Sequence, residues 1–458
     1  MTMNAVNTAT ALAEKFGLDS ANSRALVVGA GETGLSVARF LDAQGIRFAV
    51  VDSRAKPPLL DKLLENLPDA AVFTGGFDAD AFKVATHLIV SPGVSLREDS
   101  IVKAHAQGAK IIGDIDLFAA CAAAPIVAIT GSNGKSTVTT MLGAMAAEAG
   151  KKAAVGGNLG TPALDLLAPD IELYILELSS FQLERTEILN ASAATVLNIS
   201  PDHLDRYDNV AEYAREKQKI FRGTGAMVLN ADDPLVIDMA VPGRKISTFA
   251  INSEAEFHLA WDDHKGYLMR NDKRLMALDD LPLEGLHNAA NALAAVALGT
   301  AIGLDEQSIC KALKKFKGLD HRMQRVAVKN GITWVNDSKA TNIGACVAAL
   351  QGYTRQVILI AGGDAKGADM NELVPAIKSQ AKSVILMGKD GPLIEQALNN
   401  SVPIYKAENV ARAVKIAAEI AEEGDTVLLS PACASLDQYK SYKERGEKFA
   451  TAVMELNA

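Results

Sequence analysis

The sequence predicts an α/β protein of three domains, each with a mainly parallel, doubly wound sheet. Short apolar runs alternate with helix-like segments along most of the chain, which is the pattern of strands joined by crossover helices. Two of these runs lead into glycine-rich turns, and 458 residues are enough for several hydrophobic cores. Apolar residues make up 49% and charged residues 22%, a balance typical of folded rather than disordered chains.

The first domain is predicted over residues 1–113, with residues 1–23 as a loosely held extension. A strand at Ala25–Val28 leads into Gly29-Ala-Gly-Glu-Thr-Gly34, and a periodic helix then leads to a second strand that ends at Asp52. This is the G-x-G-x-x-G fingerprint of a βαβ unit with an acid on the next strand. The fingerprint requires only that a phosphate approaches the backbone closely, so NAD, FAD and a nucleoside diphosphate are all candidate ligands.

The central domain is predicted over residues 114–318, around an apolar strand, a tight glycine turn and a helix N-terminus. Backbone N–H groups and the helix dipole of such a turn cradle phosphate. Lys135 would contact the terminal phosphates, and the Ser136 hydroxyl would ligate Mg²⁺. The two glycines are two residues apart rather than four as in the usual P-loop, but the strand–turn–helix context favours ATP or GTP over a turn without ligand. The predicted phosphate site comprises Gly131, Ser132, Asn133, Gly134, Lys135, Ser136 and Thr137.

The alternation of strands and helices continues in all three domains, the third predicted over residues 319–458. Further strands are predicted at residues 87–91, 110–113, 173–178, 194–198, 332–335, 357–361, 383–387 and 426–430. Helices are predicted at residues 98–107, 137–149, 210–221, 286–302, 305–316 and 344–350, and a small antiparallel hairpin within 253–281. We therefore expect Rossmann-like first and third domains and a P-loop ATPase-like central domain.

Polar clusters follow several apolar strands, at the ends where α/β sheets bind their ligands. Glu177 ends one strand, and His203 follows the next strand along the chain. A carboxylate and an imidazole at neighbouring strand ends could ligate a divalent metal or act as acid and base. A helix N-cap or an ion pair is the alternative role for Glu177, and a hydrogen-bonded turn is the alternative for His203.

For other polar residues in the second half of the chain, a ligand-binding role and a purely structural role are both open. Asn288 and Asn291 lie one helical turn apart and could face a base or ribose, or cap the helix. Arg322 offers a bidentate phosphate contact or a salt bridge, and Asp337 follows a strand as a ligand or a turn residue. No His or Asp pattern frames Cys433, so we expect it to be a packing residue rather than a nucleophile.

Charge and cysteine usage exclude several classes of protein. A net charge of −9 argues against a general nucleic-acid or membrane-surface binder, which would need a basic face. The four cysteines lie far apart without metal-type spacing and are expected to be reduced thiols. The N-terminus lacks a signal-peptide pattern, and the longest uncharged apolar run is too short to span a bilayer. We expect a cytoplasmic protein without a nucleic-acid or membrane partner.

Taken in order, these motifs resemble those of the Mur ligase family, the ATP-dependent amide-forming enzymes of peptidoglycan precursor synthesis. The matching motifs are Thr130-Gly-Ser-Asn-Gly-Lys-Ser-Thr, Gly157-Asn-Leu-Gly, Glu177-Leu-Ser-Ser-Phe-Gln, Asp202-His-Leu-Asp-Arg-Tyr, His287-Asn-x-x-Asn, Asp320-His-Arg and Asn336-Asp-Ser-Lys-Ala-Thr-Asn. The resemblance covers the chain from about Ala25. Asn133, the first domain and the tail Ser430–Tyr442 resemble the branch that adds D-glutamate to UDP-N-acetylmuramoyl-L-alanine, and the L-alanine-adding branch is the nearest alternative.

The resemblance implies where three substrates bind. The first fingerprint is expected to hold uridine diphosphate rather than a dinucleotide. The residues implied for the UDP-linked substrate are Thr33, Asp52, Ser53, Arg54, Ser91, Asn158 and Ser179. Those implied on the ATP side, besides the glycine turn, are Asn288, Asn291, Arg322 and Asp337. Those implied for D-glutamate are Thr341, Lys366, Ser435 and Tyr442, of which Tyr442 departs from the Phe that relatives carry.

The resemblance also implies a catalytic group of Lys135, Glu177, His203 and Lys217, with ATP and two Mg²⁺ ions. Ser136 and Glu177 would hold one ion, and His203 and Lys217 the other. The family carbamylates the lysine that matches Lys217, and a carbamate is an anionic oxygen ligand of the kind that Mg²⁺ prefers. The sequence around Lys217 by itself suggests only an exposed helix lysine.

The implied reaction passes through an acyl phosphate, which must be shielded from water. We therefore expect residues 319–458 to rotate towards the central domain when ligands bind, in a protein that acts as a monomer. Two other classes stay open as alternatives: an NAD-dependent dehydrogenase, suggested by Gly29–Gly34, and a nucleotide-gated binding protein that has lost catalysis.

Overall fold

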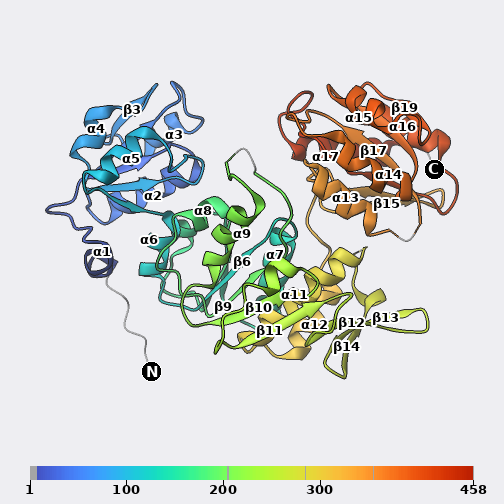
Figure 1. The fold of residues 1–458 in the computed structure, drawn as a ribbon, viewed down its shortest axis with the longest axis horizontal. Helices are drawn as coiled ribbons and strands as arrows, with labels where there is room; N and C mark the ends of the chain where they lie inside the picture. Colours follow the sequence, from blue (N-terminus) through green and yellow to red (C-terminus); the bar gives the residue numbers. More distant parts are fainter. Residues whose placement is uncertain (1–7, 204–205, 284, 354, 457–458) are drawn as a thin grey trace. The chain divides into compact units, whose positions relative to one another are not determined.

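The computed structural model describes residues 8–203, 206–283, 285–353 and 355–456 (Figure 1). The chain divides into two compact units. The first contains the described residues up to His258 together with Met269–Leu275 and Leu293–Ala312, and the second contains the remaining described residues. No helix in the described ranges has the length and hydropathy needed to cross a membrane.

The N-terminal sheet is parallel, with strand order β3-β2-β1-β4-β5. Its strands are β1 (Ala25–Val28), β2 (Phe48–Asp52), β3 (Ala71–Thr74), β4 (His87–Val90) and β5 (Lys110–Ile112). The accompanying helices are α2 (Glu32–Ala43), α3 (Leu60–Asn66), α4 (Ala79–Val84) and α5 (Asp99–Ala106). The chain runs outward from β1 in both directions, so the strand order reverses beside β1, which is where open α/β sheets bind ligands.

The N-terminal extension is not loosely held where the structure describes it. Residues 8–16 form α1 (Thr8–Phe16), and Leu12 and Leu18 are fully buried in the core of the first unit. The Nζ of Lys110 donates a hydrogen bond to the Phe16 carbonyl at 2.7 Å. The expectation was wrong for residues 8–23, because two buried leucines and a phenylalanine anchor a segment whose overall composition is polar. Residues 1–7 lie outside the described residues.

The central sheet has nine strands in the order β14-β13-β12-β11-β10-β9-β6-β8-β7. Within the part of the sheet ordered β12-β11-β10-β9-β6-β8-β7, every pair of neighbouring strands is parallel. The strands are β6 (Ile126–Thr130), β7 (Ala153–Gly157), β8 (Leu173–Glu177), β9 (Ala193–Val196), β10 (Ala226–Asn230), β11 (Ile246–Ala250), β12 (Phe257–Asp262), β13 (Lys265–Arg270) and β14 (Lys273–Ala277). Residues 253–281, predicted as a hairpin, thus contribute three strands rather than two.

The helices between Asp114 and Lys315 connect these strands and flank them. They are α6 (Asp114–Cys121), α7 (Lys135–Glu148), α8 (Ser180–Glu184), α9 (Val210–Gln218), α10 (Pro234–Ile237), α11 (Leu286–Ala301) and α12 (Glu306–Lys315). Short 3₁₀ turns are η1 (Ala163–Leu166), η2 (Lys219–Phe221) and η3 (Leu278–Asp280). The strand β6, which precedes the predicted phosphate turn, is buried along its whole length between β9 and β8.

The C-terminal sheet has the order β15-β16-β20-β17-β18-β19, with only β15 antiparallel to its neighbour. Its strands are β15 (Gln324–Lys329), β16 (Ile332–Asn336), β17 (Val357–Gly362), β18 (Ala381–Met387), β19 (Ile404–Lys406) and β20 (Thr426–Leu429). The helices are α13 (Ile343–Gln351), α14 (Val374–Gln380), α15 (Gly391–Leu398), α16 (Val410–Ile420) and α17 (Tyr442–Glu455), with the 3₁₀ turn η4 (Met370–Leu373). Separate cores lie on the two faces, one with α13 to α15 and one with α16 and α17.

The predicted α/β class with mainly parallel sheets is confirmed, while the predicted domain limits at residues 113 and 318 stay predictions. The strands that the sequence did not predict include the edge strands β3, β15 and β19. Residues of β3 and β19 are largely exposed or half-buried. An edge strand is not covered on every side, so it needs no continuous apolar run and leaves little signal in the sequence.

Candidate active site

The turn between β6 and α7 has the backbone shape of a phosphate loop. Gly131 has φ 149° and Gly134, the N-cap of α7, has φ 83° in the left-handed region. A Cβ at Gly131 would lie 2.9 Å from the Cβ of Leu197, so a side chain there would push β9 away. Asn198, just after β9, accepts a hydrogen bond from the Asn133 N–H at 2.8 Å and donates one to its carbonyl at 3.2 Å. The turn is therefore held in shape by its neighbouring strand.

Lys135 is the first residue of α7, and its side chain folds back over the turn. Its Nζ donates hydrogen bonds to the carbonyls of Gly131 and Ser132, both at 2.8 Å. A helix N-terminus carries N–H groups without intrahelical partners and a partial positive charge, so an ammonium group there strengthens an existing anion site. Lys135 therefore lies against the turn, and its contact with the terminal phosphates stays a prediction.

Ser136 on α7, Glu177 at the end of β8 and Asn158 just after β7 form a second group beside the turn. The Ser136 hydroxyl donates to Oε2 of Glu177 at 2.5 Å, and Nδ2 of Asn158 donates to Oε1 at 2.6 Å. The Glu177 side chain is buried at the end of β8. It is not a helix N-cap, because Ser179 caps α8 in a capping box with Gln182. Ser179 itself does not line the pocket described below.

Lys217 is buried rather than exposed as the local sequence suggested. It lies on α9 with 1% of its surface accessible. Its Nζ donates to the Gly131 carbonyl at 3.0 Å and to the Thr130 hydroxyl at 3.2 Å, and lies 4.7 Å from the centre of the Tyr213 ring. Burial and the nearby charge of Lys135 hold the pKa of Lys217 well below its ordinary value. The family resemblance drew attention to Lys217 as a metal-site residue, but its burial was not predicted.

His203 lies in an aromatic cluster beside the same turn. Its backbone has φ 55°, its ring centre lies 4.7 Å from that of Phe181 and 6.4 Å from that of Tyr213, and its Nε2 lies 3.6 Å from Oδ2 of Asp202. Tyr213 therefore contacts both His203 and Lys217. Leu204 and Asp205 of the same motif lie outside the described residues. The turn alternative and the ligand alternative for His203 both fit this left-handed, exposed position.

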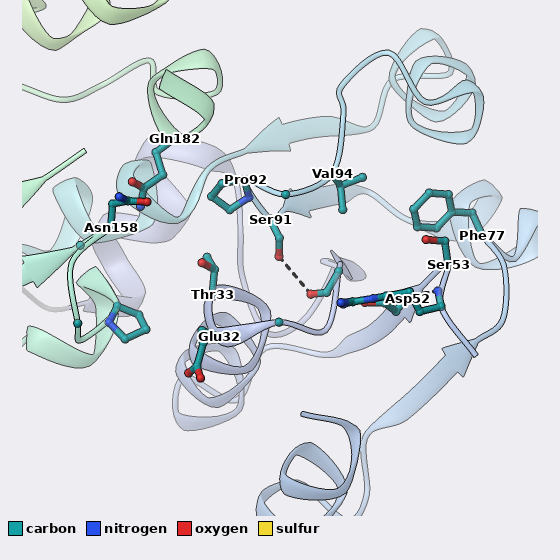
Figure 2. Close-up of a pocket in the computed structure, with 17 residues that line it drawn as sticks. Glu32, Thr33, Asp52, Ser53, Phe77, Ser91, Pro92, Val94, Asn158 and Gln182 are labelled. Carbon is teal, nitrogen blue, oxygen red and sulfur yellow. Dashed lines mark hydrogen bonds and ion pairs between the residues drawn. The ribbon is translucent and has the colours of Figure 1, made fainter. Parts of the chain in front are cut away.

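A cavity of about 590 Å³ lies within the first unit, next to the N-terminal glycine turn (Figure 2). Most of the residues predicted for the UDP-linked substrate line it, and Figure 2 shows Thr33, Ser91 and Asn158 facing the same space. The predicted residues that line the cavity are Thr33, Asp52, Ser53, Arg54, Ser91 and Asn158. The loops that follow β1, β2 and β4 converge here, because carboxyl ends of parallel strands share one edge of a sheet, and the loop after β7 of the central sheet also lines the cavity.

Asp52 holds the end of β2 against the glycine turn. One carboxylate oxygen accepts the Ala30 N–H at 2.8 Å, and Arg54 donates to both oxygens at 2.6 and 2.8 Å. Burial raises the pKa of Asp52, but the hydrogen bonds from Arg54 and Ala30 outweigh burial and the pKa is lowered overall. The acid of the fingerprint is therefore ionised and already paired within the protein.

Two arginines, Arg185 buried and Arg206 partly buried, fix one wall of this cavity, and sequence reasoning missed both. Nη1 of Arg185 donates to the Ser91 carbonyl at 2.5 Å. Arg206 donates to the carbonyls of Pro92 and Val94 at 3.0 and 3.1 Å. The only available signal was the position of Arg206 inside the Asp-His-Leu-Asp-Arg-Tyr motif, whereas Arg185 follows no recognisable pattern. Together they fasten the loop after β4 to the central sheet.

In the second unit, three of the predicted ATP-side residues, Asp337, Asn288 and Asn291, are buried and hydrogen-bonded. Asp337, after β16, accepts the Ser430 hydroxyl at 2.9 Å and the Met323 N–H at 3.3 Å. Burial raises the pKa of Asp337 to about 7. Asn288 and Asn291 lie inside α11, with 3.3 Å between the Asn291 Nδ2 and the Asn288 Oδ1, so neither caps the helix.

The predicted acceptor residues lie on loops at the carboxyl end of the C-terminal sheet and at the start of α17. The loops of Lys366 and Ser435 are joined by mutual backbone hydrogen bonds of 2.9 Å between Asp364 and Ala434. Lys366 is exposed and Ser435 is buried. Tyr442 has the Nζ of Lys339 4.1 Å from its ring centre, and Thr341 follows Lys339 on the loop after β16. Arg322 lies on the segment before β15, half-buried.

Cys433 is fully buried in the core beside α13 to α15. Burial raises the pKa of its thiol to about 12, so the thiol is not ionised at neutral pH. The burial of this thiol fits the packing role expected from the sequence.

Sequence profiles match three consecutive regions of the chain. The N-terminal domain of MurD-like Mur ligases matches residues 23–113, the Mur ligase middle domain matches residues 129–299, and the glutamate ligase domain of Mur ligases matches residues 321–433. Curated relatives include the UDP-N-acetylmuramoylalanine–D-glutamate ligase of Methylococcus capsulatus, 53% identical over 96% of both chains. The enzyme of the same name from Pseudomonas aeruginosa is 50% identical over 94% of this chain and 98% of its own. This chain belongs to the Mur ligase family.

Solved structures agree with this assignment at the level of the fold. A pseudomurein peptide ligase type C from Methanothermus fervidus covers 95% of this chain with a TM-score of 0.60 at 20% identity. The UDP-N-acetylmuramate–alanine ligase MurC of Thermotoga maritima covers 94% with a TM-score of 0.59 at 20% identity. The family and the fold predicted from the motifs are therefore confirmed, whereas the ligand assigned to each residue stays a prediction.

The donor set of this Mur ligase suits magnesium near the phosphate turn. Over the described ranges, no three His, Cys, Asp or Glu side chains gather as a metal cage. Mg²⁺ in phosphate-transferring sites needs no such cage, because it keeps waters and takes one or two protein oxygens together with phosphate oxygens. The Ser136 hydroxyl and the Glu177 carboxylate, in contact at the start of α7, are oxygen donors of this kind.

Proposed function

We propose that this Mur ligase uses ATP to join D-glutamate to UDP-N-acetylmuramoyl-L-alanine, in peptidoglycan precursor synthesis. The observation that carries the proposal is the phosphate turn of β6 and α7, with Lys135 above it, Ser136 paired to Glu177 and Lys217 buried beneath it. The relatives named above support the choice of substrates. The L-alanine-adding alternative is disfavoured by the same relatives, since all of those cited at about half identity are named for D-glutamate.

The reaction joins a carboxylate to an amine in two steps. The alanine carboxylate attacks the γ-phosphorus of ATP, so that a new O–P bond forms and ADP leaves. The amine of D-glutamate, after losing a proton, then attacks the acyl carbon, and phosphate leaves as the amide forms. A carboxylate does not react with an amine directly, because it has no leaving group, and phosphorylation supplies one.

The residues at the turn reduce the electrostatic repulsion between the alanine carboxylate and the ATP phosphates. Lys135 and the first-turn N–H groups of α7 hold the phosphates, and their positive charge offsets the charge of the approaching carboxylate. Ser136 and Glu177 would hold one Mg²⁺, and His203 and a carbamylated Lys217 the other. When bound, these ions add positive charge to the transferring phosphoryl group. Arg322, Asn288, Asn291 and Asp337 are assigned to the ATP side from the family motifs.

The burial of Lys217 supports its carbamylation. A lysine with a lowered pKa has a larger share of neutral amine at pH 7, and only the neutral amine has the lone pair that attacks CO₂. The Nζ–C bond forms, one proton leaves, and an anionic carbamate replaces a cation. That exchange also removes the unfavourable charge that Lys217 would otherwise carry beside Lys135.

The cavity of Figure 2 is assigned to the UDP-linked substrate. Thr33, Ser53 and Arg54 would contact the nucleotide end, with Asp52 and Ser91 shaping the turn through their own hydrogen bonds. Asn158 also donates to Glu177, so it connects this cavity to the phosphate turn. Ser179 is assigned near the muramoyl group from its motif alone. Thr341, Lys366, Ser435 and Tyr442 are assigned to D-glutamate.

We further propose that residues 319–458 form a domain that rotates towards the central one when ligands bind, which would exclude water from the acyl phosphate. Identical small-angle scattering profiles with and without an ATP analogue plus the UDP-linked substrate would refute this rotation. Monomeric, cytoplasmic action without nucleic-acid or membrane partners likewise stays a prediction.

The test of the proposed function is phosphate release from ATP with UDP-N-acetylmuramoyl-L-alanine and one of three acceptors. We expect release with D-glutamate and little with L-alanine or diaminopimelate. Release with another acceptor but not with D-glutamate would overturn the assignment. An absorbance change with NAD in the absence of ATP would instead support the dehydrogenase alternative.

A further inference from the structure

Arg445 is a fully buried arginine that none of the assigned sites uses. It lies one turn into α17, whose first residue is Tyr442, and 1% of its surface is accessible. Burial lowers the pKa of Arg445 to about 10, so the side chain is still charged at neutral pH. Burying a guanidinium group is costly unless its donors are satisfied, so a position of this kind needs a reason.

The donors of Arg445 are satisfied by neutral acceptors. In the described part of the chain no carboxylate lies within ion-pair distance of it. Nε donates to the Ser338 hydroxyl at 3.0 Å, and Nη2 donates to the Ser338 carbonyl at 2.9 Å. Both Nη atoms donate to the Cys433 carbonyl, at 3.1 and 3.2 Å. Longer contacts reach the carbonyls of Ala434 at 3.4 Å and Gly362 at 3.5 Å.

The oxygen atoms that accept hydrogen bonds from Arg445 belong to three loops that follow adjacent strands. In the C-terminal sheet β20 lies between β16 and β17, and the contacted carbonyls lie at or just after the ends of these three strands. The same three loops carry Thr341, Ser435 and Lys366. Ser338 also donates from its hydroxyl to the Tyr442 carbonyl at 2.8 Å. One guanidinium therefore contacts all three loops that carry residues predicted for D-glutamate, and it reaches the start of α17 through Ser338.

We propose that Arg445 is a positioning residue for the acceptor amino acid, which fixes the three loops and the start of α17 in one arrangement. The proposal rests on the assignment of these loops to D-glutamate. Only arginine has the planar fork of five donors that this arrangement requires, whereas lysine has three donors on one atom. Loop residues that bind a ligand must be held closely by their surroundings, since a small displacement costs much of the binding.

The experiment compares the variants R445K, R445M and S338A with R412M as the control. Arg412 is an exposed arginine on α16 that pairs with Glu419, so its loss leaves the loops untouched. Steady-state kinetics would give KM for D-glutamate and for the UDP-linked substrate in each variant, with thermal unfolding to confirm folding. We expect KM for D-glutamate to rise about tenfold or more in R445M, with a smaller rise in R445K and S338A and none in R412M. KM for the UDP-linked substrate, assigned to the first unit, should stay within about twofold.

Three outcomes are decisive. A rise in KM confined to D-glutamate supports the proposal. An unchanged KM for D-glutamate in R445K and S338A, or an equal rise for both substrates, overturns it and leaves Arg445 with a purely structural role. If R445M does not fold, R445K and S338A decide alone by the same criterion. Wild-type enzyme that releases no phosphate with D-glutamate would instead refute the proposed function, so the two failures are distinguishable.

Discussion

The two glycine turns of the first unit use the same backbone device with opposite charges. Gly29–Gly34 leads from the central strand β1 into α2, and Gly131–Gly134 leads from the buried strand β6 into α7. The first helical residue is Glu32 in one and Lys135 in the other. An acid in the first turn stabilises a helix but repels a phosphate, whereas a lysine attracts it. The glycine pattern thus specifies a shape, and the neighbouring charges specify which phosphate it serves.

The residues that surround the two turns also differ in charge. The first turn is held by the carboxylate of Asp52, which accepts the Ala30 N–H. The second has the ammonium group of Lys135 on the Gly131 carbonyl at 2.8 Å. A site that only holds a diphosphate needs close approach to the backbone, whereas a site that transfers a phosphoryl group needs concentrated positive charge. This contrast supports UDP at the first turn and ATP at the second.

The largest effect is expected from Lys135→Ala. Loss of the ammonium group should lower the rate of ATP-dependent turnover by on the order of 10²-fold or more, with KM for the UDP-linked substrate little changed. Stopped-flow or steady-state phosphate release would measure this. Lys151→Ala is the matched control, because Lys151 is exposed and pairs with Glu172 near the other end of α7. Full turnover in Lys135→Ala would refute the role of the second turn.

The next largest effect is expected from Lys217→Ala. We expect a loss of about 10- to 100-fold in turnover, as for other groups that hold a metal, with partial recovery on addition of formate or acetate that replaces the carbamate. A mass increase of the native protein under CO₂ would report the modification directly. Arg215→Ala, an exposed residue on the same helix, should be unaffected. Wild-type activity in Lys217→Ala would remove this residue from the mechanism.

The first turn can be tested with a pair of alanine substitutions. A Cβ at Gly34 would lie 1.8 Å from the Gly29 carbonyl oxygen, so Gly34→Ala should lower the free energy of unfolding by about 1–3 kcal/mol. A Cβ at Gly31 would meet no atom within 4 Å, so Gly31→Ala should keep its stability. It should nevertheless raise KM for the UDP-linked substrate by roughly tenfold, because the methyl group would displace a phosphate. Unchanged KM in Gly31→Ala would place the diphosphate elsewhere.

The smallest effect is expected from Asp52→Asn and concerns pH. The folded pKa of Asp52 is lowered, so its stabilising contribution is present above the unfolded value of about 3.9 and is lost as pH falls through the folded pKa. Wild-type protein should therefore exceed the variant in stability at neutral pH by less than about 1 kcal/mol, since Arg54 is half-exposed, and the gap should close in acid. Denaturant unfolding at several pH values would measure the gap. A gap that widens in acid would contradict the assignment.

Much of the site was predictable because its motifs are local. The turn Gly131–Gly134 follows a strand and begins a helix, and a strand–turn–helix signal of this kind depends on residues that are adjacent in sequence. The roles left open for Glu177 and Asn288 needed helix boundaries, since only those decide whether a residue caps a helix. Arg185 and Arg445 were missed because their partners include backbone carbonyls far along the chain, and a carbonyl leaves no trace in the sequence.

The sequence by itself determined the α/β class, the two glycine turns and, through ordered motifs, the family. Those features depend on periodicity and on residues that are close together in the sequence, so they can be recognised without the structure. Only the tertiary structure decided that Lys217 is buried, that α1 is anchored and that one guanidinium links three loops. Burial and charge environment depend on which distant segments pack together, and the pKa values of these groups follow from that packing rather than from the residue type.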